Sequence, residues 1–124
     1  MVHILLNRGQ VLSLVGRNEQ ALANFKRGLL ISEVIQNKKH QADCCLQSSD
    51  IYGSINRYED MLDSAEKSLL LYQSVNDEKG QSESLTNIGH VHNSLGDYSQ
   101  GLEYYQRSLN IQKKMANEPD RPTA

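Results

Sequence analysis

Histidines, cysteines and a cluster of acids are the side chains of this 124-residue sequence that could do chemistry. His90 and His92 stand two positions apart, so on a helix they face different sides and cannot chelate one metal ion. Cys44 and Cys45 are neighbours, and their Cα atoms lie about 3.8 Å apart, too close for ordinary disulfide geometry. We therefore expect no metal site and no disulfide, and a reducing compartment such as the cytoplasm.

The acids Glu59, Asp60, Asp63 and Glu66 are the remaining candidates for acid–base chemistry. They fall on one helix with Lys67 beside them, a pattern typical of a solvated outer face. The sequence has no glycine-rich phosphate loop and no nucleophile motif. We therefore expect no enzymatic activity, no cofactor and no small-molecule substrate.

Composition narrows the classes of partner. The chain is 38% hydrophobic and 23% charged, which suits a folded core, and its formal net charge is −2. The absence of a basic excess argues against a nucleic-acid ligand. No apolar run approaches the length of a membrane span, and Met1 to Leu6 lacks the basic region of a signal peptide. These features predict a cytoplasmic protein with no membrane partner.

The elements that position these side chains repeat with a period of 40 residues. Both prolines lie near the end of the chain, at Pro119 and Pro122, and the composition favours helices joined by short turns. Aliphatic side chains keep the same register in each period. The aligned sets include Val11, Ile51 and Val91; Leu22, Leu62 and Leu102; and Leu29, Leu69 and Leu109.

Each period is predicted to form two helices with a turn between them. In the third period Gly96 can take the left-handed conformation that ends a helix, and Asp97 can cap the next helix. Asn56 replaces that glycine in the second period, and Arg17 replaces that aspartate in the first, which predicts a weaker cap. The predicted caps of the remaining helix starts are Asn37 and Asp77.

These residues resemble the tetratricopeptide repeat. The third period carries the family pattern of small and aromatic positions as Gly89, Gly96-Asp97-Tyr98, Gly101, Tyr105 and Ser108. The first period carries it as Gly9, Gly16, Ala21, Phe25 and Gly28. In the second, Ala65 stands where an aromatic residue is usual and Met61 where a small one is usual, an exchange that could conserve local volume. In this register His92 and Cys45 occupy core positions, and we expect both to be packed.

The resemblance implies an all-α, right-handed superhelical solenoid of three antiparallel helix-turn-helix repeats with six helices. The predicted domain is 1–116, divided into repeats 1–36, 37–76 and 77–116, followed by a flexible tail at 117–124. The family's usual period is 34 residues. The longer period is similar to that of kinesin light chains and of bacterial signalling proteins.

The resemblance also implies a protein-interaction scaffold that binds a peptide or a partner helix in a concave groove. The predicted groove residues are Asn7, Gln10, Asp43, Gln47, Asp50, Glu83, Asn87 and His90, with His3, Leu6, Ser13, Leu46, Gly53, Thr86 and Asn93 at the other groove positions. Asn7, Gln47 and Asn87 could pair with a peptide backbone, or they could simply be solvated. Because these positions hold acids and no Lys or Arg, we expect neutral or basic ligands and no clamp for a carboxylate.

The ends of the chain suggest an alternative function. Solenoids normally shield their last repeat with a polar capping helix, and none follows the third period. Leu102, Leu109 and Met115 should therefore be partly uncovered and could form an end interface. In this alternative the chain is a regulatory or oligomerisation segment excised from a larger signalling protein, and it self-associates or binds a partner through that end.

Overall fold

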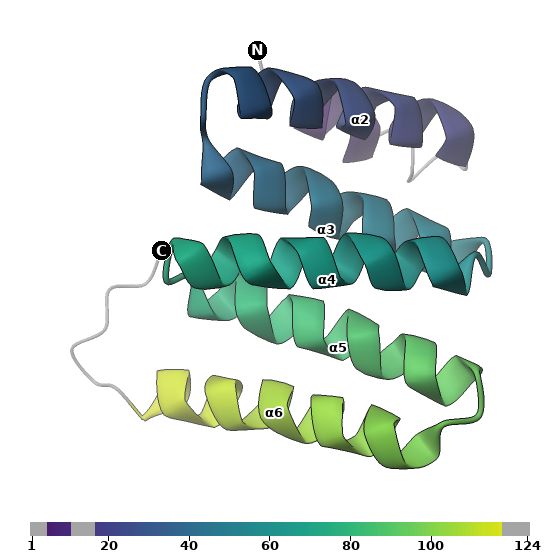
Figure 1. Ribbon diagram of the computed structural model, residues 1–124, viewed down its shortest axis with the longest axis vertical. Helices are drawn as coiled ribbons and strands as arrows, with labels where there is room; N and C mark the ends of the chain where they lie inside the picture. Colours follow the sequence, from purple (N-terminus) through teal and green to yellow (C-terminus); the bar gives the residue numbers. More distant parts are fainter. Residues whose placement is uncertain (1–4, 11–16, 118–124) are drawn as a thin grey trace.

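The protein is a stack of antiparallel helices (Figure 1), described by a computed structural model for residues 5–10 and 17–117. Residues 5–10 are helical, and five helices follow: α2 (Asn18–Val34), α3 (Lys38–Ser54), α4 (Tyr58–Ser74), α5 (Glu78–Ser94) and α6 (Tyr98–Ala116). The described residues include no strand. The fold is thus the predicted all-α helical-repeat solenoid. His3, Ser13, Gly16 and the tail beyond Asn117 lie outside the described residues.

The turns between helices share one geometry. Gln36, Asn56, Asn76 and Gly96 all have a positive φ, at 58°, 62°, 57° and 85°. The left-handed conformation predicted for Asn56 and Gly96 is confirmed. Gln36 and Asn76 were not predicted, although they stand 20 positions before these two and end α2 and α4 in the same way.

Side-chain caps begin three of the helices as predicted. Asn37 accepts a hydrogen bond from the amide of His40 at 3.0 Å, and Asp77 accepts one from Gly80 at 3.0 Å. Asp97 accepts a longer bond from the amide of Gln100 at 3.4 Å. Arg17 makes no side-chain cap bond, so the predicted weak start of α2 is confirmed.

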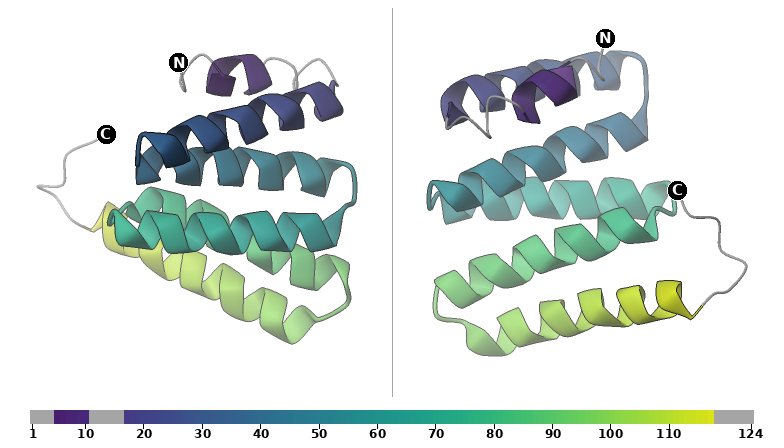
Figure 2. Two further views of the ribbon diagram at one scale, coloured as in Figure 1. Left: turned by 45° about the horizontal axis from the view of Figure 1, so that its top comes forward. Right: turned by 180° about the vertical axis from the view of Figure 1, so that it is seen from behind.

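The described helices form two layers. Each of them packs against the next along the chain, and α3 also contacts α5. No such contact joins α2 to α4 or α4 to α6 within the part of the chain that the structure describes. The helices α3 and α5 therefore form an inner layer, and α2, α4 and α6 form a more widely spaced outer layer (Figure 2).

The exchange of large and small residues predicted for the second repeat is present. A Cβ on Gly53 of α3 would lie 2.8 Å from the sulfur of Met61 on α4, so the large Met61 lies over a glycine. In the third repeat the sizes are reversed, because Gly101 of α6 faces the side chain of Asn93 on α5. The two pairs occupy equivalent positions and fill the same space in opposite ways.

A second pair in the same interface is also adjusted. Gly89 faces the ring of Tyr105, and a Cβ there would lie 2.9 Å from two ring carbons. The equivalents in the second repeat are Ser49 and Ala65, both fully buried. Since Ala65 leaves room, Ser49 keeps a side chain, and its hydroxyl donates to the carbonyl oxygen of Met61 at 3.1 Å.

Candidate functional site: a polar hollow on the inner helices

The candidate site is a hollow of about 180 Å³ bordered by the inner helices α3 and α5 and by the end of α4. Charged and polar side chains form most of its lining. The residues that line it are Lys39, Asp43, Leu46, Gln47, Tyr72, Asp77, Lys79, Gly80 and Glu83. The inner layer is the one predicted to carry the groove, so the hollow is the part of the groove that the structure encloses best.

Several predicted groove residues come together here. Asp43, Gln47 and Glu83 line the hollow. Beside them, Nδ2 of Asn87 donates to Oδ1 of Asp50 at 2.8 Å, which joins α5 to α3. The remaining predicted groove residues lie elsewhere.

His90, Asn7 and Gln10 do not line the hollow. His90 is exposed and its ring meets Tyr58 of α4 edge-on, with ring centroids 6.1 Å apart. Asn7 and Gln10 are exposed on the helical residues 5–10. Leu6, predicted as a groove position, instead packs in the main hydrophobic cluster. Leu46 is buried against Ala42 and Tyr72 and forms part of the floor of the hollow.

Two lysines of the hollow were missed from the sequence. Lys39 and Lys79 stand four residues before Asp43 and Glu83, one turn earlier on α3 and α5. They are 40 positions apart, so the period that located the acids also relates the lysines. The groove register inferred from the family began one turn too late to include them.

Lys39 ties the border of the hollow together. Its Nζ donates to Oδ2 of Asp77 at 2.5 Å and lies 3.6 Å from Oδ1 of Asp43. Although burial opposes it, the bond to Asp77 and the two nearby carboxylates raise the pKa of Lys39. Burial also opposes ionisation of Asp77, but the bonds from Lys39 and from the amide of Gly80 outweigh it and lower the pKa of Asp77.

The other acids of the hollow are held differently. The hydroxyl of Tyr72 donates to Oδ1 of Asp43 at 2.5 Å. Burial raises the pKa of Glu83, and the charges of Asp50 and Asp77 raise it further. With three carboxylates against two ammonium groups in its lining, the hollow carries an excess of negative charge.

The residues considered for chemistry at the outset lie in packed or solvated positions. Cys44 and Cys45 are free and buried, and burial raises their thiol pKa values to about 12 and about 11. His92 is packed as expected, stacked on Tyr104 with ring centroids 5.4 Å apart. Within the described residues, no group of three or more His, Cys, Asp or Glu side chains could hold a metal ion. The same residues include no helix long and apolar enough to cross a membrane.

The predicted end interface lies on α6. Leu102 is 67% exposed and Leu109 is 42% exposed, whereas Met115 is half-buried. In the second repeat the equivalent of Leu102 is Leu62, which packs against the main hydrophobic cluster. Tyr98 is also largely exposed, while its equivalent Tyr58 packs against that cluster. The exposed face of α6 thus corresponds to the face of α4 that α5 covers.

Two layers of antiparallel helices with a recurring register define a helical-repeat protein that presents a grooved inner face. A model of the tetratricopeptide repeat matches residues 47–114, and the chain belongs to this family. Proteins built from these repeats generally mediate protein–protein interactions. No curated protein matches the sequence.

Solved structures agree with this fold. The TPR domain of Arabidopsis FLU superimposes with a TM-score of 0.85 at 14% identity, over 91% of this chain and 95% of that one. BtubC (BKLC) from P. vanneervenii superimposes with a TM-score of 0.86 at 17% identity, over 99% of this chain and 51% of that one. At these identities the likeness concerns the fold alone.

Proposed function

We propose that this chain is a protein-interaction scaffold that binds a peptide or a partner helix along α3 and α5. The observation that supports this most is the polar hollow, where side chains from two consecutive repeats converge on one space. Such a space suits a segment that runs across the repeats, because each repeat offers it equivalent contacts.

The contacts available to a peptide follow from the side chains present. The amide of Gln47 can both donate to and accept from a peptide backbone. The Nδ2 group of Asn87 donates to Asp50 and, at 3.3 Å, to Ser49, so Asn87 contributes chiefly its carbonyl oxygen as an acceptor. We infer that Gln47 orients the peptide and that Asn87 joins the two repeats beneath it.

The charge of the hollow selects the ligand. Lys39 is engaged by Asp77 and Asp43, so it is not available to neutralise an incoming carboxylate. Glu83 is more exposed and lies on the opposite helix. A neutral or basic segment therefore gains attraction here, whereas an acidic C-terminus is repelled.

A displayed random-peptide library selected on the immobilised chain tests this function. The double variant Gln47→Ala with Glu83→Gln should bind the selected peptides at least about tenfold more weakly, the cost of losing about one charge-assisted hydrogen bond. Glu66→Gln on the exposed face of α4 is the matched control and should bind normally. Equal binding by the double variant, or a selection dominated by acidic peptides, would contradict the proposal.

A second candidate function is association through α6, as the regulatory or oligomerisation segment of a larger signalling protein. The observation that favours it is the exposed apolar row of Tyr98, Leu102 and Leu109. Light scattering at high concentration should then detect oligomers that Leu102→Glu removes. A monomer at all concentrations would leave the groove as the interaction surface. The cytoplasmic location stays a prediction.

A further inference from the structure

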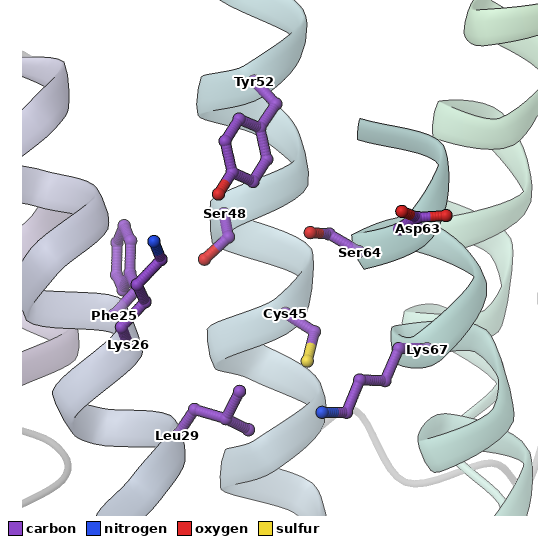
Figure 3. A pocket seen from close by; sticks show the side chains of 9 residues that line it. All are labelled: Phe25, Lys26, Leu29, Cys45, Ser48, Tyr52, Asp63, Ser64 and Lys67. Carbon is purple, nitrogen blue, oxygen red and sulfur yellow. The ribbon is translucent and has the colours of Figure 1, made fainter. Parts of the chain in front are cut away.

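A second hollow, of about 200 Å³, lies on the other side of α3, between the outer helices α2 and α4 (Figure 3). Its floor is formed by α3, and its lining is mostly apolar with charged residues at the mouth. The lining residues are Phe25, Lys26, Leu29, Cys45, Ser48, Tyr52, Asp63, Ser64 and Lys67. None of them lines the inner hollow, so this is a separate surface.

Small side chains create this hollow. Cys45 and Ser48 on α3 and Ser64 on α4 line it. The positions 40 residues later carry Leu85, Ile88 and Tyr104, each of them larger. These equivalents surround α5 in the same way that the first three surround α3. The same backbone arrangement is therefore filled in one place and left open in the other.

Tyr104 shows which group fits such a space. Its ring stacks on His92 with an interplanar angle of 4°, and the guanidinium of Arg107 lies 5.3 Å from the ring centroid. The equivalents of His92 and Arg107 are Tyr52 and Lys67, and both line the open hollow. A flat aromatic floor and a cation are thus present beside the second repeat, and the aromatic ring between them is the missing part.

Charge at the mouth indicates the neighbours of that ring. Lys26 and Lys67 flank the opening, against the single acid Asp63. Figure 3 shows the Lys67 side chain extending toward Cys45 at the floor. Two cations and one anion favour an acidic residue next to the inserted group.

We propose that the hollow between α2 and α4 is a socket for an aromatic side chain of a partner protein, a tyrosine or phenylalanine with an acidic neighbour. The partner ring takes the place that Tyr104 takes in the third repeat. It lies against Tyr52 and beside the ammonium group of Lys67. The chain then offers a partner two separate faces, the polar inner groove and this aromatic socket on the outer layer.

Three short peptides and amide-resolved NMR test the socket. The probes are acetyl-Glu-Tyr-Glu-amide, acetyl-Glu-Ala-Glu-amide and acetyl-Lys-Tyr-Lys-amide. The first should shift the amide signals of Cys45, Ser48 and Ser64 and bind about tenfold more tightly than the alanine peptide, the value of one aromatic contact. It should also bind about threefold more tightly than the lysine peptide at low ionic strength.

Ser64→Tyr supplies the missing ring from within the chain. This variant should stay folded and lose binding of acetyl-Glu-Tyr-Glu-amide, and Ser48→Ile should do the same from the floor. Ser74→Tyr, which adds the same side chain at an exposed site on α4, is the control and should bind as the parent chain does.

Several outcomes would overturn the socket. They are equal binding of the tyrosine and alanine peptides, unchanged binding by the folded Ser64→Tyr and Ser48→Ile variants, and tighter binding of the lysine peptide. Shifts of the same amides that grow with protein concentration alone would also overturn it, because the occupant would then be a second copy of this chain.

Discussion

The second and third repeats share a register and fill it in different ways. In the third, Leu85, Ile88 and Tyr104 close the space around α5 on the outer side. In the second, Cys45, Ser48 and Ser64 leave the equivalent space around α3 open. The comparison teaches that the repeat fixes the path of the backbone, while side-chain volume decides which junction stays solid and which can accept a ligand.

The largest expected effect comes from opening the solid junction. Ile88 is 1% exposed. Ile88→Ala should lower the free energy of unfolding by about 3 kcal/mol, through lost burial and the cavity left behind. Chemical denaturation measures this. Leu70→Ala, at an exposed position on the outer helix α4, should change stability by less than about 0.5 kcal/mol. A small loss for Ile88→Ala would mean that the two junctions are equally loose.

The cysteine at the floor of the open junction reports how open it is. Because the pKa of Cys45 is about 11 instead of 9.0, its thiolate fraction at pH 8 falls about 100-fold. Alkylation of the folded chain should be slower than that of a free thiol by at least this factor and should accelerate as the pH rises toward 11. Unfolding in guanidinium should restore ordinary rates. A fast folded-state reaction would show that the floor is open to solvent.

The exchange of large and small residues can be broken deliberately. Ala65→Phe places the family's usual aromatic residue in the second repeat, where Ser49 occupies the space that a glycine leaves in the third. Overpacking should lower the free energy of unfolding by about 2 kcal/mol. Ser49→Gly in the same chain should recover part of that loss. Additive losses in the double variant would refute the compensation.

The bond between the inner helices of the two repeats has a smaller value. Asn87→Ala removes the 2.8 Å bond to Asp50 and should lower the free energy of unfolding by about 1 kcal/mol. Gln106→Ala removes a 3.1 Å bond between exposed side chains of α6 and should cost less than about 0.5 kcal/mol. Equal losses would mean that Asn87 does not join the repeats.

The smallest effect concerns the helix caps. Asp97 caps α6, whereas Arg17 stands at the same point before α2 without a cap bond. Arg17→Asp should raise the free energy of unfolding by about 0.5 to 1 kcal/mol. Arg17→Ala separates a gained cap from a lost arginine and should leave stability nearly unchanged.

Much of the fold could be predicted because the repeat compares the sequence with itself. The period located the caps at Asn37, Asp77 and Asp97 and the left-handed turns at Asn56 and Gly96. Gln36 escaped prediction because neither glycine nor asparagine marks that turn. Its conformation is imposed by the tertiary contacts of α2 and α3.

The sites were harder to predict than the fold. The register found Asp43, Gln47 and Glu83, but it does not reveal that Lys39 bends toward Asp77 or that Asn87 is engaged with Asp50. These depend on distances between helices. The outer hollow depends on several volumes at once, and no single position signals it.

The most direct test of the proposed function is to map the tightest peptide from the library selection onto the chain by amide chemical shifts. The account predicts that the largest shifts fall on α3 and α5, around Gln47 and Glu83. Shifts confined to the exposed face of α6, around Leu102 and Leu109, would contradict it and assign the interaction to the end of the solenoid.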